Sequence, residues 1–314
     1  MVRPGALLAA LVLVLTGCQA GAEQEPQPTP APVLGGAGVP GPGAGLDYVA
    51  LGDSFSAGPF IGTMRTDPEG CARSRDNYPA FLADWLDVAS YTDVTCSGAV
   101  TSDLYDQMRL LDGNTAPPQL DALSPDTDLV TLGIGGNDFG IYSALLRCQD
   151  SSAGISVCPV ATLEKDARRV AGRIAAAVRR IARAAPDADV LVVGYPDILP
   201  PEGTCRAVGV SAEQLGPVVG VSRLLNRSLR RGAERSGATY VDVEAASVGH
   251  DVCAGARSWI NGPRFRAGVA APFHPKINGM RGVAATVYRQ ITGEEPDVDE
   301  NAEPDPAAVV TNQP

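Results

Sequence analysis

Short apolar runs recur along the middle of the chain, and each run is bounded by turn-forming residues. A run of this length between Gly, Pro, Asp or Asn residues is typical of a buried β-strand. We therefore predict five strands, at 47–51, 91–95, 128–134, 189–195 and 239–243.

Helical spacing of apolar residues separates these runs, and it is clearest over 163–185, which Pro186 ends. The residues on its apolar face are Leu163, Val170, Ile174, Val178 and Ile181. Further helices are predicted at 78–87, 212–236 and 275–291. Strands that alternate with helices build a mainly parallel sheet with helices on both faces. We expect a three-layer α/β/α, doubly wound domain with five strands.

The ends of the chain have a different composition from this middle part. Residues 19–45 are rich in Pro, Gly, Ala, Glu and Gln, and 294–314 are rich in Asp, Glu and Pro. Such segments bury too little apolar area to offset the entropy lost on ordering. We therefore expect a folded domain over 46–293, with a disordered tether before it and a disordered acidic tail after it.

The first 18 residues have the pattern of a signal peptide. A short start with Arg3 precedes an apolar run over 6–15, and Leu-Thr-Gly-Cys ends at Cys18. The run is too short to span a membrane, and its end resembles a bacterial lipobox. We expect lipid attachment at Cys18 and a protein at the outer face of the cell membrane, or else a secreted one.

The chain carries a formal net charge of −11 and no Lys/Arg-rich run. Phosphate binding needs a basic surface, so nucleic acid is excluded as a partner. Apart from Cys18, six cysteines remain, and an even number in an exported chain favours three disulfides. They are Cys71, Cys96, Cys148, Cys158, Cys205 and Cys253. Their spacing alone does not choose among the connectivities, and it does not suit structural zinc.

Candidate chemistry follows the first three predicted strands. Ser54 follows the first strand, Gly98 the second and Asn137 the third. In a parallel sheet these positions meet at one edge, where ligands bind. A serine at a strand-to-helix turn suits a nucleophile, and an open glycine N–H and a side-chain amide suit the stabilisation of an oxyanion. Asp53 and Asp138 are interpreted as turn or capping residues, with no chemical step.

Serine chemistry of this kind also needs a general base, and histidine is the side chain best suited to neutral pH. The chain has two histidines. His274 precedes Pro275 and the last predicted helix, whereas His250 lies in a loop next to Cys253. We favour His274 as the base and interpret His250 as a structural residue.

These residues resemble the four sequence blocks of the SGNH (GDSL-type) hydrolases, a superfamily of esterases and lipases. The blocks are Gly52-Asp53-Ser54, Gly98, Gly136-Asn137-Asp138 and His274-Pro275. Within that superfamily the chain is similar to secreted actinobacterial lipases and esterases. The resemblance implies a flavodoxin-like sheet and no metal or other cofactor. It also implies Ser54 as nucleophile, His274 as base, and an oxyanion hole made by the Ser54 N–H, the Gly98 N–H and the Asn137 side chain.

The same resemblance implies the disulfides Cys71–Cys96, Cys148–Cys158 and Cys205–Cys253. One position departs from the family. Many members carry an Asp three residues before the base, where this chain has Ala271. We expect a backbone carbonyl near Ala271 to orient the imidazole, which gives a Ser-His dyad, with another carboxylate as the alternative.

The sequence thus predicts a monomeric carboxylic ester hydrolase that acts on lipid or short acyl esters and meets the membrane only through its lipid anchor. An acetylesterase acting on polysaccharide remains an alternative substrate class. A surface solute-binding lipoprotein is the alternative from another class of protein, and it predicts two lobes and no reactive serine. A catalytically inactive cell-wall adhesin is a further alternative.

Overall fold

The computed structural model describes residues 45–148 and 158–297, together with Met1 and Gly43. The predicted signal peptide and its Cys18, almost all of the tether and most of the acidic tail lie outside the described residues. Among the helices that are described, none has both the length and the apolar character needed to cross a membrane.

One five-stranded parallel sheet forms the centre of the domain. Its strands are β1 (Asp47–Gly52), β2 (Ser90–Asp93), β5 (Leu129–Gly133), β6 (Asp189–Val193) and β7 (Thr239–Val241). They lie in the order β2-β1-β5-β6-β7, and all four pairings are parallel. This arrangement confirms the predicted doubly wound sheet, and it is one sheet rather than the two lobes of a solute-binding protein.

Three strands, β2, β6 and β7, end two residues before the predicted position, and the ends of β2 and β7 have a physical cause. β2 was expected to reach residue 95 but ends at Asp93, whose buried carboxylate accepts hydrogen bonds from the N–H and hydroxyl of Thr95. β7 was expected to reach 243 but ends at Val241, because Asp242 caps the next helix by accepting from the Ala245 N–H. In both cases an aspartate side chain accepts a hydrogen bond from a backbone N–H just past the strand, and the strand ends there.

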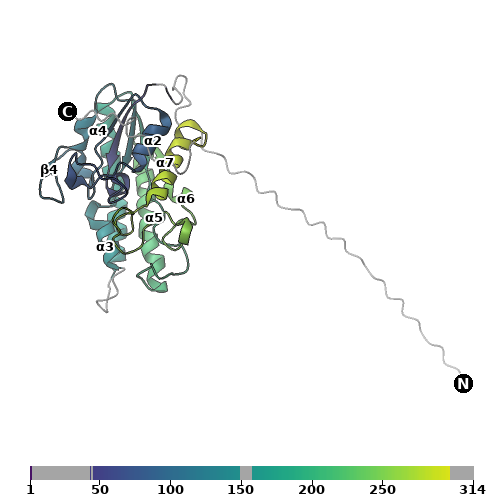
Figure 1. Cartoon of the computed structure of the whole chain (residues 1–314). Helices are drawn as coiled ribbons and strands as arrows, with labels where there is room; N and C mark the ends of the chain where they lie inside the picture. The colour runs from purple at the N-terminus through teal and green to yellow at the C-terminus, as the bar shows by residue number, and fades with distance from the viewer. Residues whose placement is uncertain (2–42, 44, 149–157, 298–314) are drawn as a thin grey trace. The chain divides into compact units, whose positions relative to one another are not determined.

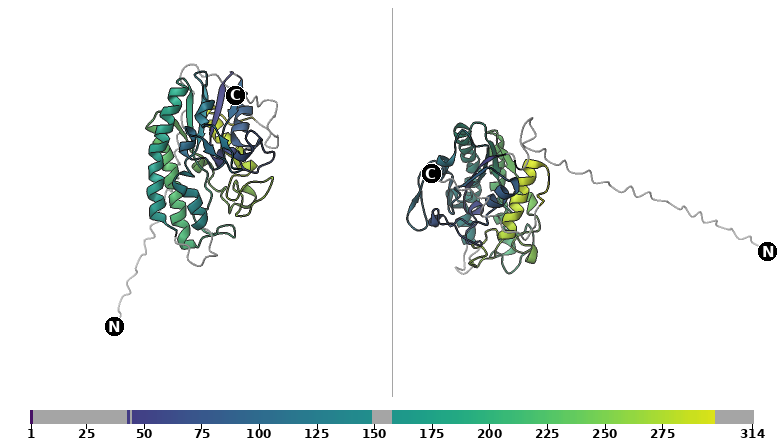
Figure 2. Two further views of the ribbon diagram at one scale, coloured as in Figure 1. Left: turned by 90° about the vertical axis from the view of Figure 1, so that its left-hand side faces the viewer. Right: turned by 45° about the horizontal axis from the view of Figure 1, so that its top comes forward.

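Helices cover both faces of the sheet, as the three-layer prediction requires. α2 (Tyr78–Leu86) and α7 (Ile277–Thr292) share one buried cluster with Tyr48 and Ala50 of β1. α4 (Val160–Ala184) and α5 (Ala212–Glu234) share the other cluster with Val49 and Leu51. Alternate residues of β1 therefore point to opposite helical layers. Figure 1 shows α2 beside α7, and Figure 2 shows α4 and α5, in teal and green, side by side.

Shorter elements connect these layers at the sheet edge that carries the predicted chemistry. Among the described residues they are α1 (Ser54–Ala57), α3 (Ile141–Cys148), α6 (Val243–Ala246), the hairpin β3 (Met108–Arg109) and β4 (Thr115–Ala116), and five 3₁₀ turns. The turns are η1 (Glu69–Cys71), η2 (Thr101–Leu104), η3 (Gln119–Ala122), η4 (Asp138–Gly140) and η6 (Gly255–Arg257). The hairpin and the turns were not predicted, because they are too short to show an apolar period.

Strand order places the binding edge between β1 and β5. The chain leaves β1 toward β2 on one side, and β5 lies on the other side, so the connections diverge there. Loops that diverge at such a point leave a crevice at the carboxyl ends of the strands. Ser54 directly follows β1, and Asn137 follows β5 by a few residues.

Candidate active site

Ser54 is held at the first position of α1 by a tight strand-to-helix turn. The fully buried Asp53 caps this helix and accepts a hydrogen bond of 2.9 Å from the Phe55 N–H. Gly52 is required before it, because a β-carbon there would lie 2.7 Å from the Gly133 carbonyl oxygen of β5. The turn brings the Ser54 hydroxyl to the edge of the sheet.

An unpredicted side chain fixes the end of β1. The buried Gln119 amide accepts from the Gly52 N–H at 2.8 Å and donates to the Gly52 carbonyl at 2.9 Å. A single side chain thus satisfies the backbone of Gly52 as a neighbouring strand would. No period in the sequence marks Gln119, since its role depends on where η3 packs.

The structure places His274 against Ser54. The His274 Nε2 lies 2.8 Å from the Ser54 Oγ, and the His274 Nδ1 lies 2.7 Å from the Pro272 carbonyl oxygen. A carbonyl oxygen only accepts, so Nδ1 carries the proton and Nε2 is left to accept from the Ser54 hydroxyl. Burial lowers the pKa of His274, although its hydrogen bond to Pro272 opposes this effect. The imidazole is therefore neutral at neutral pH.

The carbonyl that faces the imidazole lies one residue after Ala271. The carbonyl of Ala271 accepts from the Asn261 side chain at 3.1 Å and from the His274 N–H at 3.3 Å. These hydrogen bonds hold the loop. The next carbonyl, that of Pro272, faces the imidazole. Among the two successive carbonyls, it is thus that of Pro272 that lies within hydrogen-bond distance of the ring.

The two other predicted oxyanion groups line the same cavity as Ser54 and His274. Gly98 has a φ of +89°, a conformation that favours glycine. Because glycine has no β-carbon, no side chain of its own covers its N–H. Within 45–148 and 158–297, neither the Ser54 N–H nor the Gly98 N–H has a hydrogen-bond acceptor. Asn137 donates one amide proton to the Ala99 carbonyl at 3.1 Å. Donors from three different loops thus converge on one cavity.

Asp138 holds the Asn137 loop in place instead of capping a helix. Its buried carboxylate accepts from the Thr101 N–H at 3.0 Å and from the Thr101 hydroxyl at 2.6 Å. Arg173 of α4 also pairs with this carboxylate. Asp138 therefore ties the loop after β5 to the loop after β2.

Tyr195 links the nucleophile turn to the same loop. Its hydroxyl donates to the Asp53 carboxylate at 2.6 Å and accepts from the Gly136 N–H at 2.7 Å. Burial raises the pKa of Asp53 to about 7, although the hydrogen bond from Tyr195 opposes this effect. Tyr195 lies at the end of the predicted strand over 189–195, but no pattern in the sequence marks this contact.

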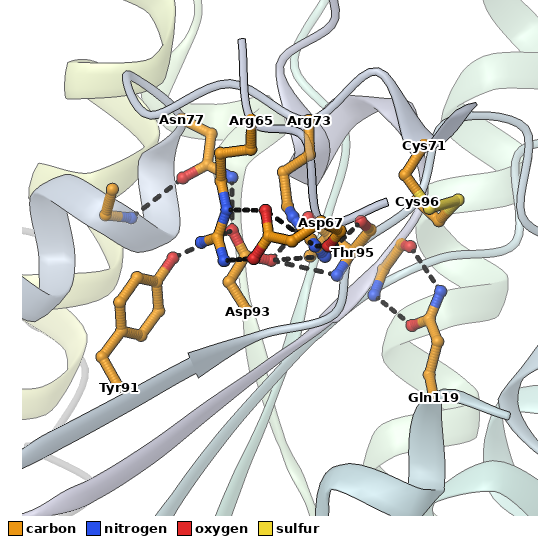
Figure 3. A network of polar contacts seen from close by, with 12 residues as sticks. Arg65, Asp67, Cys71, Arg73, Asn77, Tyr91, Asp93, Thr95, Cys96 and Gln119 are labelled. Carbon is orange, nitrogen blue, oxygen red and sulfur yellow. Dashed lines mark hydrogen bonds and ion pairs between the residues drawn. A yellow bond between two sulfur atoms is a disulfide. The ribbon is translucent and has the colours of Figure 1, made fainter. Parts of the chain in front are cut away.

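A buried ionic network supports the loop that carries Gly98. Asp93 accepts from Asn77 at 2.8 Å and from Tyr91 at 3.0 Å, and it lies 3.9 Å from the Arg73 guanidinium. Arg73 is 1% exposed and donates to the Thr95 carbonyl at 3.0 Å. Figure 3 shows these side chains gathered beside the disulfide that leads into the Gly98 loop.

The structure contains the three disulfides that the family resemblance implies. They are Cys71–Cys96, Cys148–Cys158 and Cys205–Cys253. The first joins the segment after Ser54 to the segment before Gly98, and the Ser97 N–H donates to the Cys71 carbonyl at 2.9 Å beside it.

The cavity at Ser54 has a volume of about 270 Å³ and a mainly apolar wall. The apolar side chains that line it include Phe60, Leu111, Leu145, Leu146, Ile198, Leu199 and Val218. His250 is not among the lining residues; its Nδ1 lies 2.7 Å from the Arg257 carbonyl, and its ring stacks on Trp259. Within the described part of the chain, no group of three His, Cys, Asp or Glu side chains is arranged to hold a metal ion.

Comparisons with known proteins agree with this geometry. Residues 50–281 match the GDSL-like Lipase/Acylhydrolase family. Lipase 2 of Streptomyces coelicolor is 38% identical over 256 residues, which cover 76% of this chain and 83% of that protein. A lipase of Streptomyces rimosus is 32% identical and covers 74% and 82% of the two chains.

Solved structures give the same result. The chain superimposes on phospholipase A1 from Streptomyces albidoflavus with a TM-score of 0.69 and 32% identity, covering 79% of this chain and 100% of that one. The extracellular lipase of Streptomyces rimosus gives a TM-score of 0.66 and 29% identity, covering 77% and 98%. These matches confirm the resemblance inferred from the motifs: the chain belongs to the GDSL-like lipase/acylhydrolase family and is a carboxylic ester hydrolase.

Proposed function

We propose that this protein hydrolyses lipid or other acyl esters outside the cell through a Ser54-His274 dyad. The observation that carries the proposal is the 2.8 Å contact between the Ser54 Oγ and the His274 Nε2. The Pro272 carbonyl, 2.7 Å from the opposite ring nitrogen, fixes the tautomer in which Nε2 can accept a proton.

The reaction proceeds in two halves. The Ser54 oxygen attacks the ester carbonyl while its proton passes to the His274 Nε2. The ester C–O bond then breaks, and the leaving alcohol takes the proton from Nε2. Water attacks the acyl-enzyme, gives a proton to Nε2, and releases the acid as that proton returns to Ser54. In both halves the N–H groups of Ser54 and Gly98 and the Asn137 amide hold the oxyanion.

The cavity wall supports an acyl chain longer than acetyl as the group bound. Apolar side chains from four separate segments would contact such a chain, for example Phe60, Leu111, Leu145 and Val218. The relative named phospholipase A1 is consistent with a lipid ester as substrate. An acetylated polysaccharide would leave this wall without a partner.

The test is hydrolysis of p-nitrophenyl esters from acetyl to palmitoyl. Ser54→Ala and His274→Ala should each lower kcat by roughly 10⁴-fold or more, and Asn137→Ala by about 10² to 10³-fold. Ser143→Ala, which also lines the cavity, and His250→Ala are the matched controls and should retain activity. Activity that survives Ser54→Ala would exclude the dyad, and a preference for acetyl would favour the polysaccharide esterase.

Attachment to the cell surface through Cys18 is part of the same proposal. A lipid on this residue, followed by the long Pro/Gly-rich segment, would keep the catalytic domain close to the membrane. Cell fractionation checks this, because Cys18→Ser should move the protein from the membrane fraction to the soluble one.

A further inference from the structure

Exposed leucines stand at the mouth of the catalytic cavity. Leu111, in the turn between β3 and β4, is 72% exposed, and Leu146 of α3 is 40% exposed. Both line the cavity that contains Ser54. A side chain that lines a cavity and is also open to water lies at its entrance. Apolar side chains that are exposed together, especially with polar residues around them, mark interaction sites or ligand-binding grooves.

Phe265 extends this apolar entrance on another loop. It is 55% exposed, and its ring packs edge-on against Phe60, which lines the cavity, with 4.8 Å between ring centres. The loop is tied down beside it, because the Gly62 N–H donates to the Gly268 carbonyl and the Ala271 N–H to the Pro59 carbonyl. Phe265 is thus presented to solvent by a loop with defined anchors.

Arginines flank these apolar side chains. Arg109 precedes Leu111 by two residues, and Arg264 and Arg266 stand on either side of Phe265. All three are exposed, and no carboxylate of the described residues lies within ion-pair distance of them. Burial and the nearby charge of Arg266 lower the pKa of Lys276, so a further cation is close by.

This composition contrasts with the chain as a whole, whose formal net charge is −11. A protein with that excess of acidic groups has many carboxylates available for pairing, yet the three arginines at the entrance have none. A surface that combines apolar side chains with unpaired cations is suited to bind an anionic lipid bilayer. The apolar groups enter the acyl-chain boundary while the cations pair with head groups.

We propose that the entrance, formed by Leu111, Leu146, Phe265, Arg109, Arg264 and Arg266, docks on an anionic lipid bilayer. We call these six residues the mouth patch. The proposal rests on the proposed function in one respect, which is that the docked bilayer supplies the ester. An acyl chain drawn from the bilayer would then pass over apolar side chains into the cavity without crossing water.

The test measures co-sedimentation with phosphatidylcholine vesicles that contain or lack phosphatidylglycerol. The protein is the full chain carrying Cys18→Ser, which removes the lipid anchor, and Ser54→Ala, which prevents lipid turnover. Every variant keeps the same N-terminal segment, so only differences between variants are interpreted. Binding to the anionic vesicles should exceed binding to the neutral ones.

Removing the mouth cations should weaken that binding. Combined Arg109→Gln, Arg264→Gln and Arg266→Gln should lower affinity for anionic vesicles by on the order of 10²-fold. The matched control replaces Arg179, Arg183 and Arg227 with Gln; these exposed arginines lie on α4 and α5, and their loss changes net charge equally. Equal weakening in both triple variants would overturn the proposal, since net charge alone would then explain it.

A tryptophan reporter tests the docking geometry directly. Phe265→Trp should shift its emission to shorter wavelength on anionic vesicles, whereas Val248→Trp, at a 67% exposed position that does not line the cavity, should not. No shift at residue 265, or equal shifts at both positions, would exclude docking through the mouth. With Ser54 restored and no vesicles present, the parent chain should hydrolyse a soluble short-chain ester. Failure of the proposed hydrolysis would therefore appear separately from failure of docking.

Discussion

The two sides of the active site are held together by different kinds of interaction. On the side of the nucleophile and the oxyanion donors, three carboxylates are fully buried, those of Asp53, Asp93 and Asp138. Each accepts several hydrogen bonds, and two of them also face arginines. On the side of the base, Asn261 holds the loop with a neutral amide that donates to the carbonyls of Arg264, Ala270 and Ala271.

The difference follows from what each side must do. Oxyanion donors must be aimed without moving, and buried charge-assisted hydrogen bonds hold loops firmly. A base must stay unprotonated, and a carboxylate beside the imidazole would raise its pKa. His274 instead meets the Pro272 carbonyl, and burial lowers its pKa. With the Pro272 carbonyl as its partner in place of a carboxylate, the imidazole of His274 stays neutral and able to accept a proton.

The largest effect on stability is expected on the side of the active site that contains the buried carboxylates. Asp93→Ala would leave the buried Arg73 with only the partly exposed Asp67 carboxylate as an ion-pair partner, and should lower the free energy of unfolding by about 3 to 5 kcal/mol. Urea denaturation measures this. Glu164→Ala, which removes the partner of Arg168 in an exposed pair on α4, is the control and should cost less than about 1 kcal/mol. Equal losses would show that the buried network does not hold this side.

On the side of the base, which Asn261 holds, we expect a smaller effect on stability and a clear effect on the catalytic rate. Asn261→Ala removes the side-chain donor from three carbonyls, of which that of Ala271 keeps the His274 N–H, and should cost about 1 to 3 kcal/mol. Because the loop positions His274, kcat should fall while KM stays near its original value. Asn278→Ala, which removes a single hydrogen bond to Ser258, is the matched control. Unchanged kcat in the Asn261 variant would mean that the backbone alone orients the imidazole.

The smallest effect is a difference in how stability depends on pH. Burial raises the pKa of Asp53 from 3.8 to about 7, so between those values the folded protein keeps a proton that the unfolded chain has lost. Stability from this group therefore falls as pH rises from about 4 to about 7. Asp53→Asn should remove that part of the slope in the urea midpoint between pH 5 and pH 8.

Two other groups titrate in the same window and are present in both proteins. Burial raises the pKa of Asp197 to about 6, which gives a slope of the same sign, and it lowers that of His274, which gives the opposite sign. Only the difference between the two slopes reports on Asp53. Identical slopes would show that Asp53 is already ionised in the folded protein at acidic pH.

Elements with a long apolar period were predictable from sequence, and so was the edge where the site lies. The helix over 163–185 was found because its apolar face repeats over many turns, and the observed α4 begins only three residues earlier. Ser54, Gly98 and Asn137 were located together because each follows a strand, and strand order then brings them to one place. Local pattern and parallel topology were sufficient for these features.

Partners chosen by tertiary packing were not predictable. Gln119 and Tyr195 bond to residues 67 and 142 positions away in the chain, and neither stands in a motif. The same limit explains why the orienting carbonyl could be placed only near Ala271. Which of two successive carbonyls faces the imidazole depends on Asn261, whose side chain occupies the first of them.

The arrangement of the disulfides along the chain has a consequence for synthesis. Both cysteines of each disulfide come before both cysteines of the next one along the chain, in the order Cys71–Cys96, Cys148–Cys158 and Cys205–Cys253. A nascent polypeptide emerges with its N-terminus first. Both partners of each bridge are therefore available before the first cysteine of the following bridge arrives. For these six cysteines, the order in which they emerge is enough to favour the native pairing. If each pair is oxidised as soon as both of its cysteines have emerged, no disulfide has to be rearranged later.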